Sequence, residues 1–151
     1  MKKHLVLALL LVFSGFVLAQ DTDEPVPDVG FAVIENVPVY PGCSGDDNAT
    51  LKKCMSDKIS KFVASEFNVK KASKGLESGT HRIYVNFLIG SDGKITKIKS
   101  RAPNAALEKE SIRIIKKLPK MQAGRQKGKA VGVLYTLPIT FKIDKEKKKK
   151  S

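Results

Sequence analysis

The last apolar segment of the chain alternates in polarity without a break over residues 131–143. Odd-numbered positions carry Val, Tyr, Leu, Ile or Phe, whereas even-numbered positions are mixed and mostly small. Side chains of a strand point alternately to the two faces of a sheet, so the pattern predicts a long strand with one face in a core. Pro138 cannot donate a ladder hydrogen bond, which predicts that this strand lies at a sheet edge.

An exposed sheet edge has two interpretations. Its unpaired backbone groups can accept an extended peptide as an additional strand. Alternatively, Pro138 and Lys142 protect the edge against aggregation. The residues of this strand do not decide between the two.

The remaining periodicities predict a mixed fold. Apolar residues at helical spacing indicate a helix over 49–67, and a second helix begins after Asn104 and ends before Pro119. Alternating segments 80–89 and 94–101, separated by a Ser-Asp-Gly turn, indicate a β-hairpin. The spacing of isoleucines in the second segment leaves room for a β-bulge.

The element order helix, strand, strand, helix, strand predicts an α+β fold. We expect a three-stranded antiparallel sheet in the order second, first, third, with both helices on one face. The short apolar run 31–34 can add a further strand at the N-terminal side.

The N-terminus resembles a secretory signal. Lys2 and Lys3 precede an apolar stretch at 5–18, and Ala19 offers a cleavage site before Gln20. The alternative is an uncleaved membrane anchor, although a spanning helix needs about 20 apolar residues. We expect a periplasmic protein with a signal peptide at 1–19, a flexible leader at 20–30, one domain at 31–143 and a Lys-rich disordered tail at 144–151.

The compartment guides the interpretation of the cysteines and the charge. Cys43 and Cys54 form an even pair, which predicts a structural disulfide in an oxidising compartment; two free thiols are the alternative. The formal net charge is +13. An exported protein rarely meets nucleic acid, so anionic envelope glycans or lipids are the expected partners of the basic tail, and solubility alone would also explain the charge.

The sequence has no recognisable catalytic constellation. His81 is the single histidine after the signal, and the serine-hydrolase elbow, the paired-histidine zinc motif and the phosphate loop do not occur. We expect a protein that is not an enzyme, with neither a cofactor nor a metal.

An ordered set of motifs resembles the C-terminal domain of TonB-type energy transducers. The resemblance covers about residues 31–143, and its Pro-Gly-Cys element is similar to one branch of the family. The segments that carry it are VPVYPGC at 37–43, FLI at 87–89 followed by SDGKI at 91–95, LPKM at 118–121 with Gly124, Gly128 and Lys129, and LPITF at 137–141.

The resemblance implies a periplasmic domain that captures an N-terminal segment of an outer-membrane receptor, the TonB box, as a strand beside its own last strand. The residues that would make these contacts are Val131, Gly132, Val133, Leu134, Tyr135 and Thr136. The partner would be such a receptor segment or another envelope protein, and the same edge could also pair two copies of the chain.

A transducer also has an uncleaved membrane helix and a long Pro-rich spacer. Here the N-terminal segment resembles a cleavable signal, and an extended leader at about 3.1 Å per residue would reach only some 30–35 Å. We therefore expect a free-standing binding module associated with transmembrane transport. A membrane-anchored transducer and an envelope polyanion binder are the alternatives.

Overall fold

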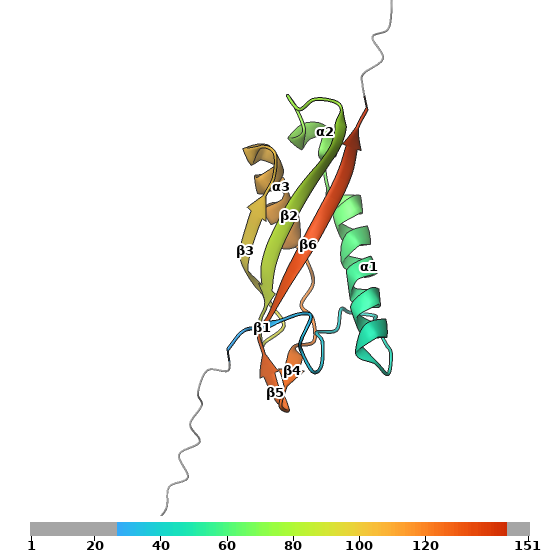
Figure 1. Cartoon of the computed structure of the whole chain (residues 1–151), viewed down its shortest axis with the longest axis vertical. Helices are drawn as coiled ribbons and strands as arrows, with labels where there is room; N and C mark the ends of the chain where they lie inside the picture. Colours follow the sequence, from blue (N-terminus) through green and yellow to red (C-terminus); the bar gives the residue numbers. More distant parts are fainter. Residues whose placement is uncertain (1–26, 145–151) are drawn as a thin grey trace, which may run out of the picture.

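The computed structural model describes residues 27–144 (Figure 1). The signal peptide, its cleavage site and nearly all of the Lys-rich tail lie outside these residues. The elements in chain order are β1 (Val29–Gly30), α1 (Asn48–Glu66), α2 (Val69–Ala72), β2 (Gly79–Ile89), β3 (Ile95–Arg101), α3 (Ala105–Ile115), β4 (Gly124–Gln126), β5 (Lys129–Val131) and β6 (Val133–Ile143). Within 27–144, no helix has the length and apolarity needed to cross a membrane.

The main sheet has the strand order β1-β6-β2-β3. β2 is antiparallel to both β3 and β6, which confirms the predicted order of the three long strands. The extra N-terminal strand is present, but it comprises Val29 and Gly30 and not the predicted run 31–34. It is also parallel to β6, so the sheet is mixed and not wholly antiparallel.

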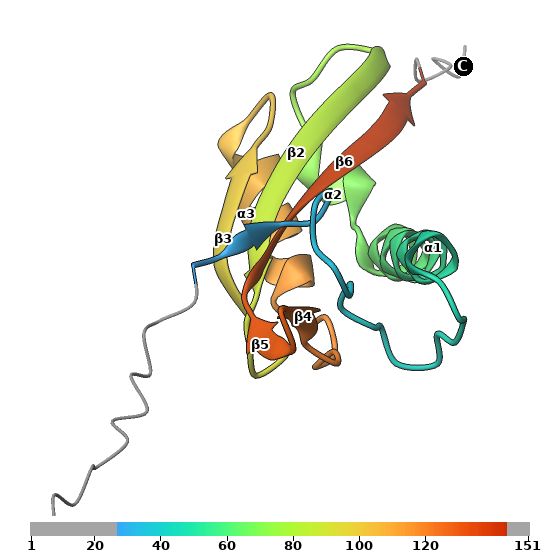
Figure 2. The same ribbon diagram turned by 60° about the horizontal axis from the view of Figure 1, so that its bottom comes forward.

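Helices α1 and α3 lie on one face of the sheet (Figures 1 and 2). The Asp47 carboxylate accepts a hydrogen bond from Thr50 N at 2.9 Å and so caps α1, while the Asn104 side chain accepts from Leu107 N at 2.8 Å and caps α3. The core between the helices and the sheet includes Met55, Ile59, Val63, Val85, Phe87, Leu107, Ile114 and Leu137.

The β2–β3 hairpin turns at the predicted Asp92-Gly93 pair. Gly93 has φ +80°, and a Cβ there would lie 1.8 Å from the carbonyl oxygen of Met121. Glycine therefore both permits the turn and lets the following loop pack against it. The predicted bulge is confirmed by a register shift between Asn86 and Leu88, near Lys97 with φ +49°.

The predicted thirteen-residue strand 131–143 is wrong at its beginning. Val131 belongs to β5, which pairs with β4 in a small separate sheet, and the main sheet resumes at Val133 after Gly132. The segment 121–129 thus contributes β4 and the first residue of β5. Lys127 and Gly128 make the connecting turn with φ +50° and +75°.

Candidate functional site

Strand β6 pairs with β2 along its whole length, from Ile89 opposite Val133 to Gly79 opposite Ile143. The side chains of Val133, Tyr135 and Leu137 are buried, whereas the even-numbered neighbours are exposed. This alternation confirms which face of the predicted strand is the core face.

The other edge of β6 has two parts. At its N-terminal end, Val29 N donates to Gly132 O at 2.8 Å and Phe31 N donates to Leu134 O at 3.1 Å. Backbone groups of successive strand residues point to opposite edges, so those of Thr136, Pro138, Thr140 and Lys142 point to the same side as those of Leu134. In the described part of the chain, no strand pairs with this second part.

The nitrogen of Pro138 consequently lies on the open side. A proline at this position removes no hydrogen bond from the β2 ladder, which explains how a regular strand accommodates it. The open edge thus offers three N–H donors, from Thr136, Thr140 and Lys142, and four carbonyl acceptors. These backbone groups are what an added strand requires.

The six residues assigned to peptide binding fall in different environments. Val131 lies in β5, Gly132 joins the two sheets, and Val133 and Leu134 are opposite β1. The Tyr135 hydroxyl lies 2.9 Å from Ser56 Oγ of α1, and burial raises the pKa of this tyrosine.

Of the six, only Thr136 has backbone groups at the open edge. Its side chain lies on the sheet face away from the helices, where Thr136 Oγ1 donates to Asn86 Oδ1 at 2.7 Å. The open stretch, Thr136–Lys142, therefore lies mostly beyond the residues that the sequence indicated. The visible sequence signal for it was Pro138.

A groove of about 410 Å³ lies beside the open edge. Helix α1 runs alongside β6 on this side (Figure 1). The groove is lined mainly by apolar groups from α1, the segment after it, and β6: Ser60, Val63, Ala64, Phe67, Val69, Leu137, Pro138, Ile139, Thr140 and Phe141. An extended segment beside β6 would place alternate side chains towards this groove.

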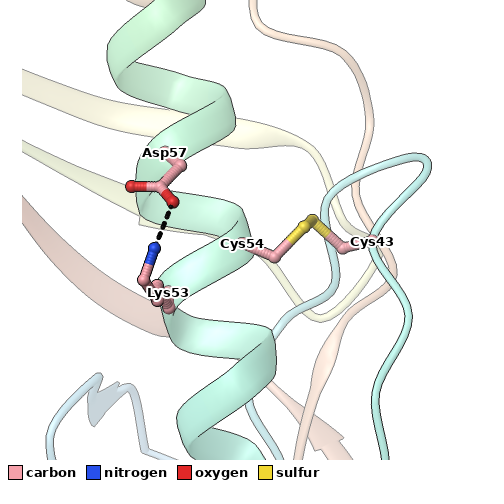
Figure 3. The surroundings of a disulfide bond; sticks show 4 residues. All are labelled: Cys43, Lys53, Cys54 and Asp57. Atoms are coloured by element: carbon pink, nitrogen blue, oxygen red, sulfur yellow. Dashed lines mark hydrogen bonds and ion pairs between the residues drawn. A yellow bond between two sulfur atoms is a disulfide. The ribbon is translucent and has the colours of Figure 1, made fainter.

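A disulfide anchors the helix that borders the groove, and an ion pair within the helix lies on its exposed side (Figure 3). The Cys43–Cys54 disulfide is formed, which confirms the prediction, and ties the Pro-rich segment to α1. Lys53 Nζ lies 2.9 Å from the Asp57 carboxylate on the solvent side. This hydrogen bond lowers the pKa of Asp57 and raises that of Lys53.

His81 has a packing role in this arrangement. Its ring stacks on Phe141 with 5.6 Å between centroids, and Nε2 lies 2.9 Å from the Glu77 carbonyl oxygen. Both contacts hold the end of the β2–β6 pair.

The strand order, the hairpin and the last long strand correspond to a known family. Residues 71–143 match the model of the Gram-negative bacterial TonB protein C-terminal. The chain contains a TonB C-terminal domain. A search of curated proteins found no match.

The family match begins near the end of α2 and includes both the open edge and the strands that support it. TonB C-terminal domains are periplasmic, couple transport without catalysing a reaction, and generally bind TonB-dependent outer-membrane receptors. The disulfide, α1 and β1 precede the matched residues.

Proposed function

We propose that this TonB C-terminal domain is a free-standing periplasmic binding module that takes up an extended segment of an outer-membrane receptor, or of another envelope protein, as a strand beside β6. The observation that carries the proposal is the row of outward backbone groups from Thr136 to Lys142. The apolar groove next to it supports the same function, because it can hold alternate side chains of the added segment.

The proposed contact, Thr136–Lys142, lies further along the strand than the residues that the resemblance indicated. Of the six residues indicated by the resemblance, Thr136 stays at the open edge, whereas Val131, Gly132, Val133 and Leu134 adjoin the contacts of β4 and β1. At about 3.3 Å per residue, the seven open residues extend over roughly 20 Å, which is enough for a short linear motif.

Thr140→Pro tests the proposal. The change removes an outward N–H while leaving the ladder to β2 intact, and Thr140→Ala removes the side chain but keeps the N–H. Probes are synthetic N-terminal segments of the TonB-dependent receptors encoded in the same genome, titrated by calorimetry. We expect at least one peptide to bind the wild type and Thr140→Ala alike, and to lose about ten-fold or more in affinity with folded Thr140→Pro.

Equal affinity of a receptor peptide for the folded Thr140→Pro and Thr140→Ala variants would contradict strand addition at this edge. Retained binding in both would instead indicate recognition by side chains alone.

A second candidate function is binding of anionic envelope lipids. Lys70, Lys74 and Lys142 border a surface hollow of about 830 Å³ at the C-terminal end of β6, which Asp144 also lines at 3.4 Å from Lys142 Nζ. Basic clusters of this kind are attracted to anionic headgroups, by about 1 kcal/mol per residue near the surface.

Co-sedimentation with phosphatidylglycerol vesicles, compared with phosphatidylcholine vesicles, tests this second function. Lys74→Glu should weaken binding and Lys109→Glu, an exposed change on α3, should have much less effect. Binding that is insensitive to salt, or equal in the two variants, would contradict it.

A further inference from the structure

Helices α1 and α3 lie on one face of the main sheet, and the opposite face, here called the outer face, points away from them (Figures 1 and 2). The outer face carries the even-numbered side chains of β2 and β6, which are exposed over most of both strands. β3 adds Lys99 and Arg101, opposite Asn86 and Tyr84 of β2. Tyr84 and Leu134 also lie here, and both are exposed large apolar side chains. The outer face is therefore accessible to a ligand.

The charged side chains of the outer face are predominantly basic. Arg82, Lys99 and Arg101 are exposed, and within residues 27–144 none of them forms an ion pair. Arg101 is two residues from Lys99 along β3 and lies diagonally from Arg82 across the sheet, so adjacent charged positions are about 7 Å apart. Lys142, at the far end of β6, has Asp144 at 3.4 Å. The row from 99 to 82 is therefore a surface of one sign, which attracts an anionic segment.

Asp28 brings the segment before β1 to one corner of this face. Asp28 Oδ2 lies 2.7 Å from Lys97 Nζ of β3. A Cβ on Gly132 would lie 2.3 Å from Asp28 Oδ1 and 3.2 Å from Leu88 Cδ1, so the carboxylate lies near Leu88 on the outer face. Leu88 is buried, unlike the even-numbered residues before it in β2. Figure 2 shows β1 entering from the side of β3, so the chain before Asp28 starts beside the basic row.

The segment before Asp28 has the charge that this face lacks. Pro25 and Pro27 favour an extended chain, because proline fixes φ and restricts the residue before it. No basic residue occurs between 20 and 28. The acidic residues of the segment, which lie outside the described part of the chain, are Asp21, Asp23 and Glu24.

The spacing of the acidic residues matches the spacing of the basic ones. Glu24 is four residues before Asp28, which is about 12 Å in an extended proline-rich chain at about 3.1 Å per residue. Arg101 is four residues after Lys97, which is about 13 Å along a strand at about 3.3 Å per residue. With Asp28 held at Lys97, Glu24 can therefore reach Arg101.

We infer that the acidic leader of this chain, residues 21–28, lies along β3 on the outer face. The contact of Asp28 with Lys97 fixes one end, and the carboxylates at 21, 23 and 24 lie close to Arg101 and Arg82. The leader covers the basic row, so an outside anionic molecule must displace it to reach this face. The contact uses side chains of the outer face and not the backbone edge of β6, so it can fail without affecting the proposed receptor contact.

A spin label on the leader tests the inference. The label is attached at Thr22→Cys in the isotope-labelled chain that begins at Gln20, and a nitroxide broadens the amide signals of nearby residues. We expect the signals of Tyr84, Lys99 and Arg101 to lose intensity about two-fold or more, because opposite charges hold the leader there. The signals of α1 and α3, on the opposite face, should change little. The reference is the same sample with the label reduced.

Removing the leader charges should abolish the effect. In the labelled chain with Asp21→Asn, Asp23→Asn and Glu24→Gln, the signals of the outer face should recover. They should also recover in the unsubstituted labelled chain at 1 M salt, where the screening length is about 3 Å.

A matched control neutralises three exposed acids elsewhere, so that the net charge of the chain is the same as in the neutral-leader variant. We expect this control to keep the loss of signal at the outer face. Its substitutions are Asp46→Asn, Asp57→Asn and Glu77→Gln.

A charge swap tests the pairing of Glu24 with Arg101. Arg101→Glu should restore the signals of the outer face, and adding Glu24→Arg to it should bring back the loss; Lys109→Glu, an exposed change on α3, should have no effect. No selective loss in the labelled chain, or an equal loss with the neutral leader, would overturn the inference. Failure of the swapped chain to regain the loss would overturn the placement of Glu24 beside Arg101.

Discussion

Pro138 of β6 lies opposite Tyr84 of β2, and its nitrogen points away from β2 towards the open edge. The outward direction follows from the Leu134 carbonyl, which accepts a hydrogen bond from Phe31 on that same side. The proline therefore interrupts the row of donors that a neighbouring strand could use, without weakening the sheet on its inner side. A strand that needs a hydrogen bond from position 138 pairs poorly with this edge, whereas one that uses only the neighbouring donors can still pair.

Replacing the proline should increase self-association. Pro138→Val supplies the missing N–H, so the edge becomes able to pair with a second copy of the chain. We expect the dimer population in sedimentation velocity to rise by about ten-fold, with little change in the unfolding midpoint. Thr136→Val adds similar apolar surface without a new donor and should remain monomeric; equal association of the two variants would assign the effect to apolar surface instead.

The disulfide should contribute measurably to stability. Replacing both Cys43 and Cys54 by Ser removes a cross-link between residues eleven apart, which should lower the free energy of unfolding by about 3 kcal/mol. Denaturant melts check the value. A reducing agent should destabilise the wild type and have no further effect on the double variant, and an unchanged wild-type melt on reduction would contradict the structural role.

The Glu110–Arg113 pair should make stability fall in acid. Arg113 Nε and Nη2 donate to the two carboxylate oxygens at 2.8 and 2.7 Å, and Asn68 N also donates to Oε1. These hydrogen bonds lower the pKa of Glu110 below its usual value of 4.5, and those from Arg113 have the largest effect. A lowered carboxyl pKa stabilises the fold above the unfolded value, and this contribution is lost as the pH falls below about 4.5 through the folded value.

We therefore expect Glu110→Gln to cost roughly 0.5–1 kcal/mol at pH 7 and progressively less below pH 4, because the pair is partly exposed. Urea melts across this pH range measure the difference. Glu77→Gln, a change at an exposed position, is the control. A constant difference at all pH values would show that the carboxylate charge is not the cause.

The exported form should begin at Gln20. Cleavage after Ala19 leaves the protein without its apolar N-terminal stretch, so we expect it in the soluble periplasmic fraction of its native cells. Intact-mass analysis of protein recovered from those cells decides the point. Recovery of a chain beginning at Met1 from the inner membrane would favour the anchored-transducer alternative.

Several elements could be predicted from sequence because local rules and packing agree there. Asp47 and Asn104 cap helices whose apolar stripes face the core, and Asp92-Gly93 makes the tight turn of a hairpin. Pro138 indicated an edge position for the last strand from its missing donor alone, which holds for residues 136–142, whereas β1 covers the N-terminal end of β6. Together, these positions allow the strand order and the orientation of β6 to be predicted from the sequence.

The remainder depends on long-range contacts. Gly132 keeps the odd–even alternation in step, so the alternation alone does not show that the chain changes sheets there, although an isolated glycine in a strand often marks such a break. The apolar run 31–34 resembles a strand, yet its first part forms the turn that follows β1, and Ile34 packs in a small cluster with Val131 and Val133. Which part of β6 stays open is set by β1, whose two residues carry almost no strand signal of their own.

The most direct test of strand addition is backbone hydrogen exchange along β6 with and without a bound receptor peptide. We predict that exchange at the amides of Thr136, Thr140 and Lys142 slows at least ten-fold in the complex. The amides of Tyr135 and Ile139, which face β2, should already be protected and change little. Protection confined to α1 or to the α2 region, with these three amides unchanged, would contradict strand addition at the open edge.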